Sequence, residues 1–257
     1  MELLRCIAAN RSPESYLAGA TVLNRTSGSP RFSQDIDLFH DLADQVALCA
    51  DQDAATLTKA GYAVEWILRT GTFHRAVVTL RGQQVKVEWA QDSAFRFFPV
   101  QKDAFCGYRL HDADAATNKI LALASRSEIR DFVDVLHLHQ TYLTLGTLVW
   151  AACGKDPGFT PDFLLDQVSR HTAYTQVDVE RLQLKTPLDL KVLKRTWLDA
   201  LSAAQKLVAS LPTEEIGCFY LNPHFVLVNP NPSANAFSLL IRHCGSVRGA
   251  WPTVVPL

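Results

Sequence analysis

Acidic residues alternate with apolar ones in the segment Asp35–Phe39, which reads Asp-Ile-Asp-Leu-Phe. A period of two is typical of a β-strand, so Asp35 and Asp37 are expected on one face, about 6–7 Å apart. Two carboxylates at this spacing repel each other unless a cation or a proton lies between them. Magnesium accepts a few carboxylates and keeps water or phosphate oxygens elsewhere, so the pattern predicts a Mg²⁺ site. The alternative interpretation is that Asp35 and Asp37 form the solvated face of an edge strand and bind no metal.

A second alternating segment, Val85–Trp89, carries Glu88. If this strand pairs beside the first, Glu88 joins Asp35 and Asp37. Three acids on two strands suit phosphoryl transfer by two metal ions, one orienting a triphosphate and one activating an attacking hydroxyl. We therefore predict Asp35, Asp37 and Glu88 as the catalytic, metal-binding residues.

A glycine-led turn precedes these acids. Gly19, Ala20 and Thr21 can lead into a helix whose N–H groups and hydroxyl meet phosphates. A loop rich in glycine, serine and proline follows, and Arg31 and Ser33 then stand just before the acidic pair.

Basic residues recur in the helical segment Asp114–Leu145, which is predicted to form one or two helices. At 100° per residue, Lys119, Arg126 and Arg130 fall within roughly 40° of one another. Such a stripe can bind a triphosphate tail, with arginine offering bidentate contacts. The alternative is a solvated face on which Arg130 pairs with Asp134.

Two patterns, Gly-Ala-Thr with Arg-x-Ser-x-Asp-x-Asp-Leu-Phe and Lys followed by Arg-x-x-x-Arg-Asp-x-x-Asp, together resemble the AbiEii-type nucleotidyltransferases, the toxin half of type IV toxin–antitoxin systems. The resemblance covers roughly residues 15–140. It implies the DNA-polymerase-β-like core, metal on the Asp-x-Asp pair and a lysine facing the nucleotide. The residues that it assigns to the nucleotide site are Gly19, Ala20, Thr21, Arg31, Ser33, Lys119, Arg126 and Arg130.

One position departs from the family pattern, because Ala20 replaces the second glycine of the usual pair. If this position needs a positive φ, alanine costs about 1–2 kcal/mol. If it does not, alanine donates the same N–H. Asp131 and Asp134 also match the family, and we expect them to organise the helix and its arginines.

The elements that must position these residues change in character along the chain. A helix is predicted at Asp41–Ala60, and strands at Ala63–Arg69, Phe73–Leu80 and Gln84–Ala90 should form a mixed sheet with helices on one face. Further helices are expected at Thr160–Arg170 and at Pro187–Leu211, the latter capped by Thr186, and the tail holds strand-like runs at Cys218–Leu221 and Phe225–Val228. The prediction is an α+β fold: a polymerase-β-like nucleotidyltransferase core at residues 1–110, then a mostly helical domain at 111–257 that completes the nucleotide site.

The composition and charge of the chain limit the functional classes to which it can belong. The net charge of −1 shows no global basic field, so nucleic-acid binding would need a local patch. The sequence has neither an apolar run that could span a membrane nor a signal-peptide pattern at its start. The 6 cysteines lack a C-x-x-C pair, so we expect free thiols and a reducing cytoplasm rather than a zinc site or disulfides.

The functional hypothesis is transfer of a nucleoside monophosphate from a nucleoside triphosphate to an acceptor hydroxyl, with Mg²⁺ as cofactor. The resemblance makes tRNA or another RNA an acceptor to consider and a cognate antitoxin a partner to consider; the residues themselves support neither. The alternative is a non-catalytic nucleotide-binding or regulatory protein that keeps the fold. Ala20 is its chief support, and retention of all three acids argues against it.

Overall fold

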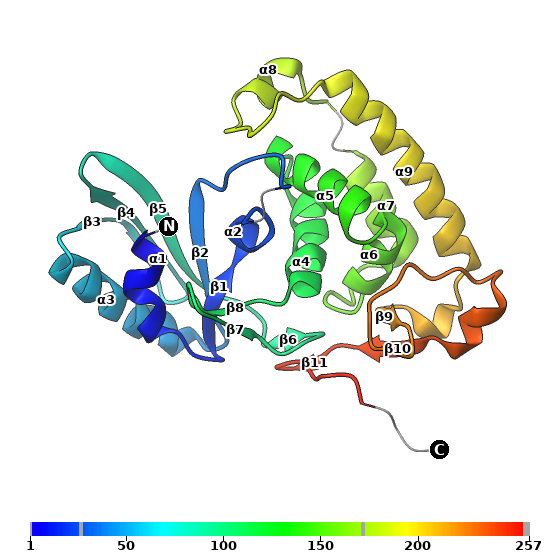
Figure 1. Cartoon of the computed structure of the whole chain (residues 1–257), viewed down its shortest axis with the longest axis horizontal. Coiled ribbons are helices and arrows are strands. Elements are labelled where there is room, and N and C mark those ends of the chain that lie inside the picture. The colour runs from blue at the N-terminus through cyan, green and yellow to red at the C-terminus, as the bar shows by residue number, and fades with distance from the viewer. Residues whose placement is uncertain (1, 26–27, 171–172, 254–257) are drawn as a thin grey trace. The chain divides into compact units, whose positions relative to one another are not determined.

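The computed structural model describes residues 2–25, 28–170 and 173–253 (Figure 1). These residues form two compact units. Unit 1 holds residues 2–25, 32–115 and 247–249, and unit 2 holds residues 28–31, 116–170, 173–246 and 250–253. The short segment 28–31 therefore belongs to unit 2, although the residues before and after it in the sequence belong to unit 1.

A mixed sheet is the frame of unit 1, as the sequence predicts. Within the described residues it has seven strands in the order β3-β4-β5-β2-β1-β8-β7. The central β2 runs parallel to β5 and antiparallel to β1. The strands are β1 (Ser15–Ala18), β2 (Asp35–His40), β3 (Ala63–Arg69), β4 (Phe73–Leu80), β5 (Gln83–Gln91), β7 (Gln101–Asp103) and β8 (Gly107–Arg109), with the short β6 (Phe95–Arg96) and β11 (Ser246–Val247) pairing separately.

The three strands predicted after residue 60 are confirmed, and the turn between the last two explains their register. Leu80 ends β4 and Gln83 begins β5, so the hairpin loop has two residues. Arg81 and Gly82 have φ of 51° and 78°. Two successive positive φ values are typical of the type I′ turn, whose twist matches that of the strands it joins.

Helices cover both faces of this sheet rather than the single face that we predict. The alternation in β2 buries Ile36, Leu38 and His40 on one face, where α1 (Glu2–Ile7) and α3 (Ala43–Lys59) complete the core. The short α2 (Gly19–Leu23) begins on the other face, against Asp37. Figure 1 shows α1 and α3 on one side of β1 and β2, and α2 on the other. A 3₁₀ turn, η1 (Ala8–Asn10), follows α1.

Unit 2 is mostly helical and packs around its longest helix. α9 (Leu190–Ser210) buries Trp197, Ala200 and Ala204, and it contacts α5, α6 and α7. The ring of Trp197 lies 5.2 Å from that of Phe132, centroid to centroid. The helices are α4 (Asp112–Ser125, which starts in unit 1), α5 (Ile129–Thr141), α6 (Leu145–Ala152), α7 (Pro161–Ser169), α8 (Gln176–Glu180) and α9.

Two helical segments differ from the sequence prediction in detail. Asp114–Leu145 forms two helices, one of the two outcomes predicted, but residues Arg126–Glu128 separate α4 from α5, so the single helical wheel used for its cations does not describe them. The last long helix begins at Leu190 instead of Pro187, since the Asp189 carboxylate accepts a hydrogen bond from Lys191 N at 2.7 Å and caps it.

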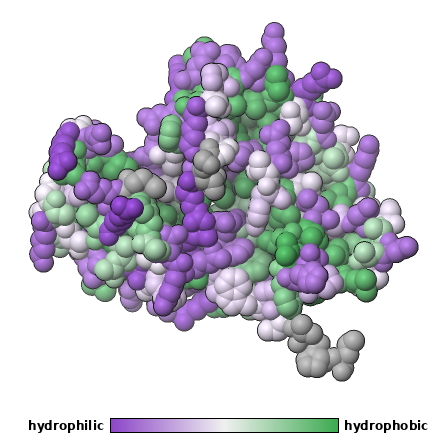
Figure 2. Space-filling view, in the orientation of Figure 1, coloured by the Kyte–Doolittle hydropathy of each residue, from purple (hydrophilic) through white to green (hydrophobic). Residues whose placement is uncertain are grey.

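The end of unit 2 is a small apolar region. β9 (Cys218–Leu221) pairs antiparallel with β10 (Ile241–Cys244), and the 3₁₀ turns η2 (Thr213–Glu215) and η3 (Asn235–Leu239) lie nearby in the chain. The strand expected at Phe225–Val228 is wrong: that segment makes one isolated bridge, Leu221 to Leu227. Figure 2 shows apolar surface around β9, where Val226 is 56% exposed.

The cysteines and the apolar character of the helices bear on two further expectations. All six cysteines are free thiols, four of them buried, as the sequence predicts. In the described part of the chain, we find no helix with the length and apolar character needed to cross a membrane.

Candidate active site

The turn from β1 into α2 brings the chain's backbone against an acidic side chain. Gly19, the first residue of α2, has φ +64°, in the left-handed region that favours glycine. A Cβ at Gly19 would lie 1.8 Å from Asp37 Oδ2. No side chain fits there unless the carboxylate moves, so the structure brings these two predicted site residues into direct contact.

Ala20 occupies a different conformation from Gly19. It lies inside α2, it is not among the residues with positive φ, and its carbonyl accepts a hydrogen bond from Asn24 N at 2.8 Å. The left-handed residue of this turn is therefore Gly19. Alanine at position 20 carries no left-handed strain, and its departure from the glycine pair costs nothing in backbone conformation.

The pairing of β2 with β5 places the three predicted acids on one face. Asp35 lies opposite Lys86, and Asp37 lies opposite Glu88. Because alternate residues of a strand share a face, these four side chains form one surface, here called the acidic face. The side chains of Asp35 and Glu88 are each 18% exposed. The sheet register therefore brings Asp35, Asp37 and Glu88 together as neighbours on two strands.

Two cations balance this face. The Lys86 ammonium lies 3.1 Å from Asp35 Oδ1 and 3.3 Å from Glu88 Oε1. Arg75 on β4, directly opposite Glu88, donates from Nε to the same Oε1 at 2.9 Å. Lys86 thus bridges the two strands of the acidic face, whereas the Arg75 guanidinium holds Glu88 from its outer side.

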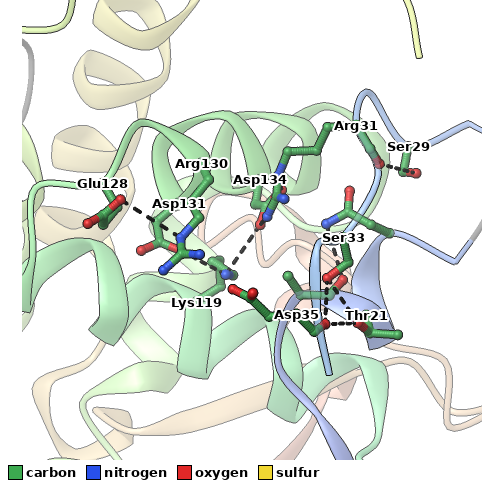
Figure 3. A network of polar contacts seen from close by, with 12 residues as sticks. Thr21, Ser29, Arg31, Ser33, Asp35, Lys119, Glu128, Arg130, Asp131 and Asp134 are labelled. Atoms are coloured by element: carbon green, nitrogen blue, oxygen red, sulfur yellow. Dashed lines mark hydrogen bonds and ion pairs between the residues drawn. The ribbon is translucent and has the colours of Figure 1, made fainter. Parts of the chain in front are cut away.

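Hydroxyl groups tie α2 to the start of β2. Thr21 Oγ1 donates to the Asp35 carbonyl oxygen at 2.7 Å and contacts Ser33 Oγ at 2.9 Å. Ser33 Oγ also donates to the Asp35 carbonyl at 3.0 Å (Figure 3). Both predicted site hydroxyls therefore fix the strand end that carries the Asp35 carboxylate.

In unit 2, the predicted cations meet two buried carboxylates. Lys119 Nζ lies 2.7 Å from Asp131 Oδ1 and 3.2 Å from Asp134 Oδ2. Arg126 Nε donates to Asp131 Oδ2 at 2.7 Å, and Arg31 binds Asp134 through Nε at 2.8 Å and a terminal nitrogen at 2.6 Å. Figure 3 shows Lys119 pointing between the two aspartates.

This network, Arg126–Asp131–Lys119–Asp134–Arg31, joins three cations to two carboxylates. Burial alone would raise the pKa of the Asp131 carboxyl, but Lys119 and Arg126 outweigh burial and hold that pKa below its usual range. The two buried aspartates therefore hold the three cations in place.

The predicted helical stripe of cations is replaced by this network. Arg130 Nε lies 3.9 Å from Glu128 Oε2, and Figure 3 shows its side chain beside Asp131 and Lys119. The segment 28–31 supplies Arg31, whose backbone bridges to Leu184. Lys185 N donates to the Pro30 carbonyl at 2.8 Å, which anchors the same segment.

The sequence matches one protein family over residues 2–208, described as the nucleotidyl transferase AbiEii toxin of type IV toxin–antitoxin systems. The chain belongs to the AbiEii family. It is a nucleotidyltransferase of a toxin family, and the resemblance stated from the motifs is confirmed.

Solved structures share the AbiEii-type fold. The nucleotidyltransferase toxin MenT4 of Mycobacterium tuberculosis is similar with a TM-score of 0.58 and 17% identity, covering 82% of each chain. JHP933 of Helicobacter pylori has a TM-score of 0.51 and 20% identity, covering 81% of this chain and 91% of its own. These likenesses confirm the α+β fold. A search of curated proteins found no significant match.

Nucleotidyltransferases such as the AbiEii family generally use a divalent metal ion, and the carboxylates of the acidic face are ligands of the type that such an ion binds. Carboxylate oxygens are the ligands of hard divalent cations, and the Gly19 turn leaves room for the Asp37 carboxylate that a Cβ would fill. In the described residues, no three His, Cys, Asp or Glu side chains are gathered closely enough to hold a metal together. Asp35 and Glu88 instead share Lys86.

Two residues of the candidate site in this AbiEii protein, Lys86 and Arg75, are not among those predicted from the sequence. Lys86 stands two residues before Glu88, so the alternation of β5 already places it on the same face. Arg75 gives no such signal, because only the pairing of β4 with β5 brings it opposite Glu88. His74, next to Arg75 on β4, points to the buried face and contacts Trp66. His139 accepts from Leu145 N at 3.0 Å, a structural contact.

Proposed function

We propose that the chain transfers a nucleoside monophosphate from a nucleoside triphosphate to the hydroxyl of an RNA acceptor, with Mg²⁺ on the acidic face. The observation that carries the proposal is the close approach of Gly19 to Asp37, beside Asp35 and Glu88 on the paired strands. A structural strand face would have no need of a glycine turn held against one of its carboxylates.

In this proposal Asp35, Asp37 and Glu88 hold Mg²⁺, and Glu88 assists deprotonation of the acceptor hydroxyl. The ion would supply charge stabilisation for the triphosphate and a more acidic hydroxyl. The residues of the chain do the positioning. The N–H groups at Gly19 and Ala20 donate toward phosphate oxygens, and Thr21 and Ser33 hold the end of β2 so that its carboxylates stay aligned.

Lys119, Arg126 and Arg130 are the proposed phosphate-binding cations, with Arg31 and Ser33 shaping the loop before the acids. The support is the gathering of three cations in the Arg126–Asp131–Lys119–Asp134–Arg31 network. Asp131 and Asp134 keep the cations extended and ordered, which reduces the entropy lost when a triphosphate binds. The predicted division at residues 1–110 and 111–257 remains part of this proposal.

Membership of a type IV toxin–antitoxin family supports a separate antitoxin protein as partner. Nucleoside triphosphates and RNA occur together in the cytoplasm, and we propose that compartment for the reaction. The rival proposal of a non-catalytic protein loses its chief support, since Ala20 lies in a helix without strain.

The test is incubation of the protein with each nucleoside triphosphate labelled on its α-phosphate, Mg²⁺ and total RNA. Asp35→Asn/Asp37→Asn is the control variant. We expect label to enter RNA with one preferred nucleotide and to disappear with the control. Label that remains unchanged in the control contradicts the metal assignment, and label that enters protein or a small molecule contradicts RNA as acceptor.

A further inference from the structure

Lys86 places a positive charge between the carboxylate of Asp35 on β2 and that of Glu88 on β5. Its ammonium is within 3.3 Å of one oxygen of Asp35 and one of Glu88, which belong to different strands. The Lys86 side chain is 33% exposed. It therefore has solvent on one side, and its flexible four-carbon stem can carry the ammonium away without unfolding the strand.

Arg75 provides a comparison on the same face. Its Nε contacts Glu88 Oε1 and its guanidinium stacks near the Phe73 ring, with 5.1 Å from the guanidinium carbon to the ring centroid. This planar group contacts Glu88 from β4, the neighbouring strand on the side away from β2. Of the two cations, Lys86 is the one that links both carboxylates.

We propose that Lys86 is a positioning residue that holds Asp35 and Glu88 together before metal binds and gives way when metal arrives. The inference rests on the proposed function, because it takes a divalent ion to be the ligand of these carboxylates. Without Lys86 the carboxylates would repel each other and separate. With it, their spacing is kept, and the ion must compete with the ammonium for the same oxygens.

This competition has two consequences of opposite sign. Removing the Lys86 charge strengthens metal binding, because the ion no longer displaces an ammonium and meets a more negative face. The same removal destabilises the metal-free protein, because the facing carboxylates lose their shared counter-charge.

The experiment compares Lys86→Met with wild type by calorimetric titration of Mn²⁺ and Mg²⁺, without nucleotide, and by thermal unfolding in EDTA and in saturating metal. Lys86→Arg keeps the charge. Lys102→Met, at an exposed position on β7 of the same unit, removes the same charge away from the acidic face. Lys86→Gln replaces the methionine variant if the latter does not fold.

We expect Lys86→Met to bind metal roughly 3- to 10-fold more tightly than wild type, as for a partly exposed charge contact. Its Tm should fall in EDTA and recover in saturating metal. Lys86→Arg and Lys102→Met should each stay within about twofold of wild type. Unchanged or weaker metal binding by Lys86→Met overturns the proposal.

Asp35→Asn/Asp37→Asn separates this result from the proposed function. If that variant loses metal binding while Lys86→Met binds as wild type does, the metal site stands and the role of Lys86 is wrong. If it binds metal as wild type does, the proposed metal site itself is wrong, and the role given to Lys86 falls with it.

Discussion

Gly19 and Ala20, adjacent in the turn from β1 into α2, have very different backbone conformations. Gly19 has a positive φ and faces Asp37 at a distance that excludes a Cβ, while Ala20 is an ordinary helical residue. The family's glycine pair is therefore reduced here to the one glycine that the geometry requires. The contrast provides a matched test of the site.

Gly19→Ala should destabilise the protein by about 2 kcal/mol, since alanine is strained at positive φ and its Cβ displaces the Asp37 carboxylate. We expect nucleotidyl transfer to fall by about tenfold or more. Ala20→Gly should leave transfer near wild type and cost about 0.5–1 kcal/mol, because glycine weakens a helix. Urea unfolding and initial rates measure both. Equal losses in the two variants would contradict the distinct roles.

His40 ends the strand that carries the acids, and it points to the opposite, buried face. Neither of its ring nitrogens has a hydrogen-bond partner among the described residues. Burial, with smaller contributions from Arg11 and His74, lowers the pKa of His40 to about 3. The folded protein therefore keeps this imidazole neutral under conditions in which the unfolded chain protonates it.

Stability should depend on pH for this reason. Below a pH of about 6.5 the unfolded state binds a proton that the folded state does not, so the free energy of unfolding falls as pH decreases, by up to ~1.4 kcal/mol per unit. His40→Phe should remove this share of the slope between pH 6.5 and 4.5. Denaturant titrations at several pH values check it, with His224→Phe at an exposed position as control. The same slope in wild type and His40→Phe would exclude His40 as the cause.

At the scale of elements, a break in a predicted helix creates the cation network. The chain leaves α4 at Ser125 and begins α5 at Ile129, which lets Arg126 and Lys119 reach Asp131 from two directions. One continuous helix would have kept the cations in a stripe on its surface. The buried aspartates of α5 are thus the centre of the arrangement.

Asp131→Asn should therefore cost about 2–4 kcal/mol of stability, because it breaks a buried pair, although Asp134 continues to balance Lys119. The pKa of Asp131 is depressed, so its contribution is present above the unfolded value of about 3.9 and is lost as pH falls through the folded value. Asp166→Asn, in the exposed pair with Arg170, should cost under 1 kcal/mol. Chemical unfolding at pH 7 compares them; similar costs would refute the structural role of the network.

At the scale of the whole molecule, membership of a toxin family predicts an effect on growth. Induced expression of the wild-type chain in a bacterial host should reduce colony counts by at least about tenfold, whereas Asp35→Asn/Asp37→Asn should not. Matched expression levels, checked by immunoblot, are the control. Equal growth arrest by both proteins would show that toxicity does not depend on the acidic pair.

The segment 28–31 shows how the chain's order and its folded units differ. These residues stand between α2 and β2 in sequence, both of which belong to unit 1, yet they fold with unit 2. Arg31 binds Asp134, 103 positions away, and its backbone bridges to Leu184.

The sequence by itself determined much of this protein. The alternation of β2 and β5 predicted the strands and the acids on their faces, and the motifs identified the family. These signals are local, since each depends on residues a few positions apart. Local rules can also compete. Thr186 and Asp189 are both residues that can cap α9; the predicted cap, Thr186, is wrong, and the cap is Asp189.

Tertiary structure alone decided which charges meet. The pairing of β4 with β5 brings Arg75 to Glu88, and the α4–α5 break turns a stripe of cations into a network around Asp131 and Asp134. Lys86 was visible in the alternation, but its bridge to Asp35 depends on the register of β2 against β5. The attraction between two charges weakens with distance, so an ion pair forms only where the fold brings its two partners close together. That depends on the positions of whole elements, which no local pattern specifies.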